Sequence, residues 1–282
     1  GYYGPAAAKQ LRYLLKNVAR TPTGAISQRA SPKQVQLWSD SAYMGPPFLA
    51  YYGWVTQNQS LVQMAFDELK LQRSALHRPQ DPGRHLWRHI IEFPNNTKAT
   101  RAIDARVWLT GNGWAAAGML RVAAIISHSP WADKMQAQHD QLVQWADDII
   151  TAAYQFVDPG TGLLLNAIDD PSTFLDGSGS ALLSYAVFRL ASMDQGRKKH
   201  VDMAEKAYQT LSKSLNSLSQ FTNGIQTVNE MQSNEAGATS TESLAFLILM
   251  AAARRDYHAN NVTGSTLSLI HISEPTRLRR IS

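Results

Sequence analysis

Hydrophobic positions along the chain follow two alternating helical patterns. Four segments place apolar residues on one stripe and charged residues elsewhere, which is typical of surface helices; they are 5–19, 60–76, 133–154 and 198–216. Four others are apolar on nearly every side, which predicts helices buried all round; they are 46–57, 114–127, 178–193 and 242–257. Only Arg121 interrupts 114–127, and only Arg189 interrupts 178–193. The chain therefore alternates between outer and inner helices.

This alternation predicts an all-α fold built from helical hairpins. The segments before the inner helices begin near residues 40, 111, 177 and 241, a regular spacing that suits a repeated hairpin, and we find no comparable run of strand signals. Inner helices in a ring with outer helices around them form an α/α toroid, whose six-hairpin version needs about twelve helices. Eight are visible here. We therefore expect an incomplete six-hairpin barrel, with the missing third chiefly on the N-terminal side.

Composition narrows the class of protein. The chain has 282 residues, 44% of them hydrophobic, which is enough for a large core, and it contains no cysteine. Its apolar segments are too short for a bilayer span, so we expect no membrane association. Residues 267–282 resemble the translation of a sequencing adapter, so we treat 1–266 as the partial barrel domain and 267–282 as a non-native tail.

The charge balance argues against a nucleic-acid partner. The formal net charge is +5, but the tail holds three arginines and one glutamate, so residues 1–266 carry only +3. Without a basic stripe or a recognisable reading helix, we expect no nucleic-acid binding.

The segments that precede the inner helices are the candidate site. If the inner helices are parallel, these four segments meet at one rim, where helix N-termini favour an anionic ligand such as a carboxylate. Trp38, Trp108 and Trp114 lie near this rim and offer flat apolar faces to sugar rings. The segments are 37–47, 107–114, 174–180 and 238–243.

Simpler explanations exist for each of these residues. Asp40 and Asp176 are placed to cap helices, and a tryptophan before a helix is often only packed. The Asn112-Gly113 pair is typical of a turn at a helix entry. The run WADD at 145–148 looks like paired carboxylates, but it falls on an outer helix, where a solvated face explains it.

The segment LWRHIIEF at 86–93 adds two groups capable of proton transfer, His89 and Glu92. A hydrogen-bonding role for the histidine is an equally good interpretation. Histidines elsewhere show no metal-ligand spacing, and no phosphate loop, dinucleotide fingerprint or nucleophile elbow is present. We therefore expect neither a metal nor a cofactor.

With these residues in view, the sequence resembles the unsaturated rhamnogalacturonyl hydrolases of glycoside hydrolase family 105, in particular their fungal branch. The matching stretches run in order along most of residues 5–257, and they are LWSDSAYMGPPFLAYYG (37–53), LWRHI (86–90), WLTGNGWAAAGMLRV (108–122), FLDGSGSALLSYAVFRLA (174–191) and ESLAFLILMAAA (242–253). The family has the six-hairpin α/α barrel, in agreement with the helical pattern.

The resemblance implies a hydration reaction on an oligosaccharide from pectin or rhamnogalacturonan. In the family, an acid protonates the C4=C5 double bond of a terminal unsaturated uronic acid, water adds at C5, and the hemiketal opens and releases the neighbouring sugar. It implies catalytic roles for Asp40 as acid or water-positioning base, Glu92 as its partner and His89, with Asp104 as a substitute for Glu92. It also implies a substrate-binding group, which comprises Trp38, Tyr43, Trp108, Asn112, Trp114 and Asp176.

This sequence departs from the family pattern in two places. The family often has Trp-x-Asp-Asp where Trp38-Ser39-Asp40-Ser41 keeps one acid, and His-x-x-Asp where this chain has His89 and Glu92. A non-catalytic sugar-binding relative, or another α/α-barrel carbohydrate enzyme of the mannanase or epimerase type, are therefore the alternatives. Asn58, Asn95 and Asn261 begin glycosylation sequons, which agree with the secretion we expect, with a cytoplasmic location as the alternative. The sequence does not indicate an oligomeric state.

Overall fold

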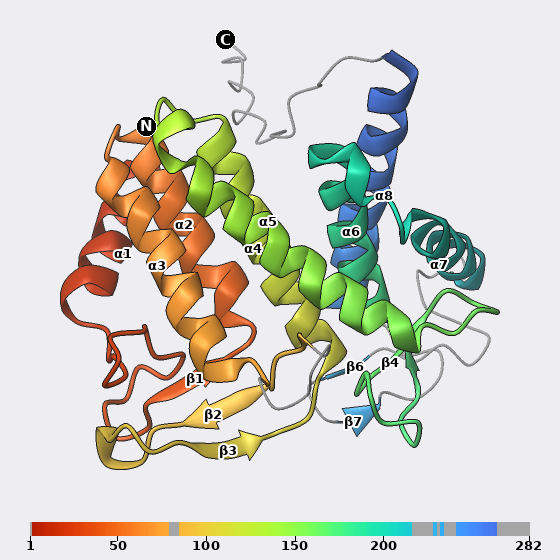
Figure 1. The fold of residues 1–282 in the computed structure, drawn as a ribbon. Coiled ribbons are helices and arrows are strands. Elements are labelled where there is room, and N and C mark those ends of the chain that lie inside the picture. Colours follow the sequence, from red (N-terminus) through yellow and green to blue (C-terminus); the bar gives the residue numbers. More distant parts are fainter. Residues whose placement is uncertain (1, 79–84, 216–227, 230–231, 234–240, 264–282) are drawn as a thin grey trace, which may run out of the picture.

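The computed structural model describes residues 2–78, 85–215, 228–229, 232–233 and 241–263. All eight predicted helices are present in this described part (Figure 1). The tail 267–282 and residues 238–240, the first half of the fourth rim segment, lie outside it. The helices are α1 (Gly4–Lys16), α2 (Ser41–Val55), α3 (Gln59–Leu76), α4 (Leu109–Ser127), α5 (Gln136–Ala153), α6 (Gly177–Met193), α7 (Val201–Ser214) and α8 (Thr241–Thr263).

The helices form two layers, as the alternation predicts. The inner helices α2, α4, α6 and α8 pack side by side in chain order, and α3, α5 and α7 cover them from outside. The inner helices are buried on most sides because their surfaces are apolar all round, whereas the outer helices bury one stripe. The fold is therefore an arc of an α/α toroid.

Glycines let neighbouring inner helices approach closely. A Cβ on Gly118 of α4 would overlap the Ala42 carbonyl oxygen of α2, and a Cβ on Gly179 of α6 would lie 2.6 Å from Leu109 Cγ of α4. Ser39 and Ala42, at the start of α2, lie against Gly111 and Gly118 of α4, so contacts advance along both helices in the same direction, and the first turns of α4 and α6 meet at Leu109 and Gly179. The inner helices α2, α4 and α6 are therefore parallel.

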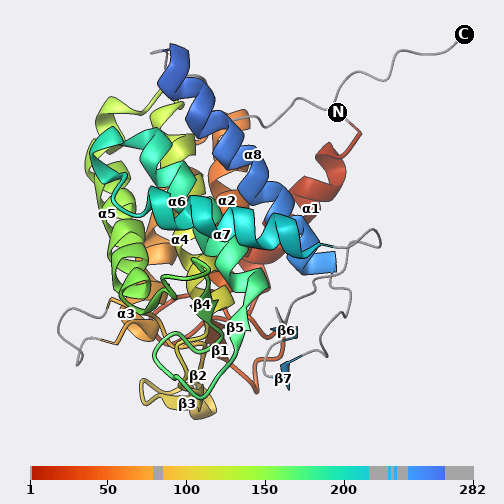
Figure 2. The ribbon, with the colours of Figure 1, turned by 90° about the vertical axis from the view of Figure 1, so that its right-hand side faces the viewer.

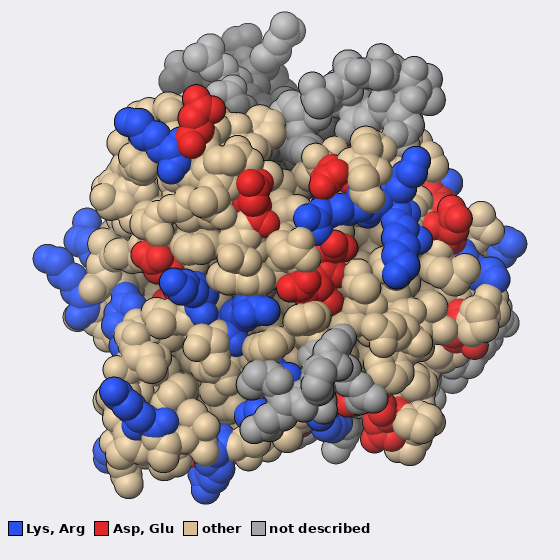
Figure 3. Space-filling view, in the orientation of Figure 1, with Lys and Arg blue, Asp and Glu red and all other residues tan. Residues whose placement is uncertain are grey.

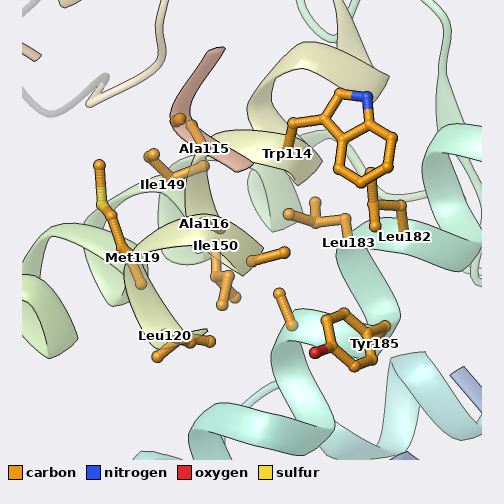
Figure 4. Packing of buried hydrophobic residues seen from close by; sticks show 14 of the residues in the cluster. Trp114, Ala115, Ala116, Met119, Leu120, Ile149, Ile150, Leu182, Leu183 and Tyr185 are labelled. Atoms are coloured by element: carbon orange, nitrogen blue, oxygen red, sulfur yellow. The ribbon is translucent and has the colours of Figure 1, made fainter. Parts of the chain in front are cut away.

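The core fills the space between the two layers. Figure 4 shows Met119 and Leu120 of α4 near Ile149 and Ile150 of α5, with Leu182 of α6 on the other side. These five side chains are almost fully buried. At about 25 cal/mol per Å² of apolar surface removed from water, such a layer supplies most of the driving force for folding.

Two inner helices begin earlier than predicted. Helix α2 starts at Ser41 rather than residue 46, and α4 starts at Leu109 rather than residue 114. The prediction of a turn at Asn112-Gly113 was therefore wrong, since both residues lie inside α4. In α2, Pro46 has no N–H for the carbonyl of Ala42. Gly118 of α4 packs against that carbonyl instead, so tertiary packing outweighs the local proline signal.

Short strands were missed because two to four residues are too few to show an alternating pattern. Strands β1 (Gln36–Trp38), β2 (Ile90–Glu92) and β3 (Arg101–Asp104) form an antiparallel sheet in the order β1-β2-β3. Two-residue strands β4 (Leu164–Leu165) and β5 (Leu175–Asp176) pair with each other, as do β6 (Val228–Asn229) and β7 (Gln232–Ser233). In Figures 1 and 2 strands β1 to β5 lie together at one end of the helices.

The outer surface mixes both signs of charge. On the face in Figure 3, Lys and Arg side chains stand next to Asp and Glu rather than in one continuous stripe. Ion pairs between outer elements contribute to this mixture, for example Arg197 with Asp147. Among the described residues, no helix has the length and apolar character needed to cross a bilayer.

Candidate active site

The segments before α2, α4 and α6 meet at one end of the arc, as parallel inner helices require. A Cβ on Gly111 of α4 would overlap the Ser39 hydroxyl that precedes α2. The backbone N–H of Leu109 donates to the Asn166 carbonyl at 2.8 Å, and Asn166 donates through its side chain to Asp176, which precedes α6. Three of the four rim segments therefore form one surface.

The sheet at this end joins three titratable side chains. The Ser39 N–H donates to the His89 carbonyl, and the His89 N–H donates to the Arg106 carbonyl, which aligns the ends of the strands. His89 Nδ1 lies 2.9 Å from Asp104 Oδ2, and His89 Nε2 lies 3.5 Å from Asp40 Oδ2. We call Asp40, His89 and Asp104 the acid–histidine array.

Exposure divides this array into a buried and an open part. The side chains of His89 and Asp104 are 1% and 6% exposed, whereas that of Asp40 is 17% exposed. Asp104 also accepts hydrogen bonds from Arg106, at 3.0 Å from Nε and 2.8 Å from Nη2. Asp40 is thus the member of the array that faces outward.

The electrostatics of the array favour charged His89 and Asp104. Burial lowers the pKa of His89, but Asp40 and Asp104 outweigh it, so the net shift is upward. Burial raises the pKa of Asp104, but hydrogen bonds from Arg106 and His89 outweigh it and lower that pKa to about 2. The ionised Asp104 therefore fixes the Nδ1 proton of His89 and leaves Nε2 toward Asp40.

Replacing Asp104 by Asn is expected to lower the free energy of unfolding by about 2 kcal/mol near neutral pH, since a charged hydrogen-bond acceptor is lost. The contribution of Asp104 is complete above its unfolded pKa of 3.8 and disappears as the pH falls through about 2. That of His89 is complete below its unfolded pKa of 6.5 and is lost as the pH rises through the raised folded value. Urea denaturation should therefore show the largest loss between these two unfolded pKa values.

The pair His139–Asp140 provides a matched control, because its Nδ1–Oδ1 distance is also 2.9 Å but the Asp140 side chain is 63% exposed. Asp140→Asn is expected to change stability by less than about 0.5 kcal/mol. A loss in Asp104→Asn that stays constant between about pH 3 and pH 5.5 would contradict the assignment of its charge.

Glu92 has partners other than the array. Its carboxylate pairs with Arg101, and Gln36 Nε2 donates to its Oε1 at 3.4 Å. His89, by contrast, contacts Asp104, the array member that sequence analysis held as a substitute for Glu92. The structure therefore brings together Asp40, His89 and Asp104, while Glu92 joins the sheet's own ion pair.

Two of the four aromatic residues predicted for the site, Trp38 and Trp108, contact the array. Trp38 meets the His89 ring edge-on with centroids 5.7 Å apart, and Trp108 lies 4.4 Å from the same ring. Trp38 is partly exposed, whereas Trp108 and Trp114 are buried. Trp114 of α4 contacts Tyr43 of α2. Packing thus explains most of the surface of Trp108 and Trp114, and Trp38 and Tyr43 retain exposed surface.

Helix capping, the simpler explanation for both Asp40 and Asp176, holds for only one of these two carboxylates. Asp176 is fully buried, and its carboxylate accepts hydrogen bonds from the backbone of Ser178 and Gly179, which caps α6, and from the Asn166 side chain. Burial raises the pKa of Asp176, and it outweighs these hydrogen bonds, which lower that pKa. Asp40 makes no capping hydrogen bond to α2. Capping therefore accounts for Asp176, while the Asp40 carboxylate is directed to His89.

Asn112 ties the array to helix α4. Its Oδ1 accepts from the Trp87 N–H at 2.8 Å, and its Nδ2 donates to the carbonyls of Trp87 and Trp108 at 3.0 Å. The side chain is fully buried. Asn112 therefore fixes the backbone two residues before His89. Its hydrogen bonds also explain why helix continues through an apparent turn sequence.

Arg106 was missed by sequence analysis. It clamps Asp104 from two residues further along the chain, at the end of β3. The Asp-x-Arg spacing was visible in the sequence, but its meaning depends on a strand too short to predict. The role of Arg106 can therefore be recognised only once the three-stranded sheet is known.

The chain also matches the model of a known protein family. The model of Glycosyl Hydrolase Family 88 matches residues 2–251. The chain belongs to this family. The resemblance to family 105 is confirmed at the level of the fold, because solved structures described as possible members of family 105 share the fold of this family 88 chain.

Three solved structures illustrate that shared fold. A possible member of family 105 from Salmonella enterica aligns with a TM-score of 0.74 at 20% identity, covering 90% of this chain and 66% of that one. Another possible member, from Klebsiella pneumoniae, gives 0.75 at 19% identity with the same coverage. An unsaturated glucuronyl hydrolase from Bacillus sp. GL1, described as responsible for the degradation of glycosaminoglycan, gives 0.66 at 14% identity, covering 95% and 69%. The chain thus spans just under two thirds of the two family 105 structures.

Proposed function

We propose that this protein is a glycoside hydrolase that removes a terminal unsaturated uronic acid from an oligosaccharide by hydrating its C4=C5 double bond. The observation that carries this proposal is the acid–histidine array, which presents the Asp40 carboxyl at the joined N-terminal ends of three inner helices. Membership of family 88 and the shared fold with an unsaturated glucuronyl hydrolase support the same class of substrate.

A single open carboxyl suffices for this chemistry. In its acid form Asp40 donates its proton to C4, water attacks C5, and a proton of that water returns to the Asp40 carboxylate. The product carries a hydroxyl at C5 and is a hemiketal. It opens by breaking the bond between C5 and the ring oxygen, and the hemiacetal left at C1 then releases the neighbouring sugar.

The other members of the array position this carboxyl. The Asp104 carboxylate accepts from His89 Nδ1, so Nε2 is directed to Asp40 Oδ2. Because Arg106 neutralises Asp104, the buried pair carries no uncompensated negative charge beside the substrate. His89 and Asp104 are therefore positioning residues, and Asp40 is the catalytic one.

The proposed natural substrate is a fragment of pectin or rhamnogalacturonan. Partly exposed Trp38 offers an aromatic face next to Asp40, which suits the apolar face of a sugar ring. The aligned N-termini of the inner helices favour the negative charge of a uronate.

The direct test is the absorbance of an unsaturated uronyl disaccharide, which falls when the double bond is hydrated. We expect the purified chain to consume this disaccharide and to release an unmodified reducing sugar. Binding of the disaccharide without loss of absorbance would instead show a non-catalytic sugar-binding relative. A saturated disaccharide of the same composition is the control, because it contains no bond to hydrate.

A further inference from the structure

Among the described residues, a groove on the inner face of the arc is lined by all four inner helices and by none of the outer ones. Its volume is about 500 Å³. Polar groups and aromatic rings from α2, α4, α6 and α8 line it; the residues that matter here are Tyr43, Arg121, Tyr185, Arg189, Arg255 and Asp256. Arg121 and Arg189 are the charges that interrupt two apolar inner helices in the sequence, and both face this groove.

The charges of this groove do not cancel. Arg189 Nη1 lies 2.9 Å from Asp256 Oδ2, and Arg255 Nη2 lies 2.7 Å from Asp256 Oδ1, so two guanidinium groups share one carboxylate. Within the described part of the chain, Arg121 has no carboxylate within ion-pair distance. The groove therefore holds an excess of positive charge, and Arg121 is its open cation.

Aromatic side chains hold the cations in place. The Arg121 guanidinium lies 4.7 Å from the Tyr43 ring centroid, and that of Arg189 lies 5.5 Å from the Tyr185 ring centroid. Burial and the neighbouring Tyr185 raise the pKa of Tyr43 to about 12, although Arg121 acts in the opposite direction. The Tyr43 hydroxyl thus keeps its proton and remains a hydrogen-bond donor.

We propose that this groove binds the carboxylate of a sugar acid, with Arg121 as its ion-pair partner and the Tyr43 hydroxyl as a donor. A guanidinium presents two parallel N–H groups that match a carboxylate, and a tyrosine hydroxyl supplies a third donor. Phe48 and Tyr51 on α2 offer apolar surface to the sugar ring. A hexuronate satisfies both requirements.

The groove lies next to the acid–histidine array. Tyr43 follows Asp40 by three residues, so the two side chains share a face of α2. Trp114 packs on Tyr43 with centroids 4.4 Å apart. An acidic oligosaccharide can therefore contact Asp40 and Arg121 along the same surface. The choice of a sugar acid, rather than another carboxylate, rests on the proposed function.

The test compares two sugars that differ only at C6. D-galacturonate carries a carboxylate and no C4=C5 bond, so it is bound without being consumed, and D-galactose is its neutral counterpart. Titration followed by ligand-observed NMR is expected to show D-galacturonate binding at least about tenfold more tightly to the unaltered chain. This comparison needs no variant, so it remains valid if a substitution prevents folding.

Two substitutions then identify the cation. Arg121→Gln is expected to remove the preference for D-galacturonate, and Arg121→Lys to retain part of it, since the charge remains but the guanidinium fork is lost. Arg255→Gln removes the same charge from the rim of the groove. It is expected to lower D-galacturonate affinity by less than about threefold, because Arg255 is 68% exposed and paired with Asp256.

Equal affinity of the unaltered chain for the two sugars would overturn this inference, and so would equal losses in Arg121→Gln and Arg255→Gln. Failure of this inference can be distinguished from failure of the proposed function. A chain that hydrates the unsaturated disaccharide but shows no Arg121-dependent binding keeps the function and loses the carboxylate site. A chain that binds D-galacturonate through Arg121 without hydrating the disaccharide does the reverse.

Discussion

Asp40→Asn is expected to lower kcat/KM for an unsaturated uronyl disaccharide by about 10³-fold, the range that a positioned proton-transfer group supplies. The amide keeps the size of the side chain but can neither donate the proton to C4 nor accept one from water. The side chain of Asp40 makes no cap on α2, so the substitution leaves the helix intact. The absorbance assay measures the loss, and the unfolding midpoint is expected to stay within a few degrees.

Glu92→Gln is the matched comparison. Its carboxylate pairs with Arg101 and lies in the sheet outside the array, so this change is expected to lower kcat/KM less than about tenfold. If Glu92→Gln abolished turnover while Asp40→Asn retained it, Asp40 would lose its assignment as the catalytic acid. The role predicted for Glu92 from the family resemblance would then be the correct one.

Gly118→Ala is expected to lower the free energy of unfolding by about 3 kcal/mol. The new Cβ would overlap the backbone oxygen of Ala42, which belongs to a rigid helix and has no side-chain freedom to move away. Helices α2 and α4 must therefore separate along their shared contact. Urea denaturation followed by circular dichroism measures the change.

Gly45→Ala is the control within the same pair of helices. A Cβ at Gly45 meets no heavy atom within 4 Å, and Gly45 lies inside α2. The substitution is expected to stabilise the protein by about 0.5–1 kcal/mol, since alanine loses less conformational entropy than glycine in a helix. Equal effects of the two substitutions would show that the close approach of α2 and α4 is not tight.

The long elements of this fold were predictable because their apolar pattern repeats over several turns. All eight helices were found, and so was their alternation between inner and outer positions. The predicted starts of α2 and α4 were less accurate, since both helices begin five residues earlier than predicted. There, Pro46 and the Asn112-Gly113 pair give local signals for a helix start or a turn, but contacts with distant residues extend both helices backwards.

The candidate site was predictable in part. Asp40 and His89 stand in recognisable stretches, but their proximity depends on a sheet whose strands have three or four residues each. Arg106 and the role of Asp104 emerge only from that sheet. Sequence reasoning also treated Arg121 as an interruption of an apolar helix, because a groove formed by four distant segments leaves no local pattern.

Strand β3 of the three-stranded sheet contains positions that tolerate substitution next to one that does not. On β3, the residues from Arg101 to Ile103 are exposed, while Asp104 at the end of the strand is buried against His89. Backbone hydrogen bonds hold this strand, and they are indifferent to the side chains it shows to solvent. Saturation mutagenesis would therefore meet three permissive positions directly before an intolerant one. The exposed edge strand of the sheet can diverge during evolution up to Ile103, while Asp104 and its contact with His89 are inherited unaltered.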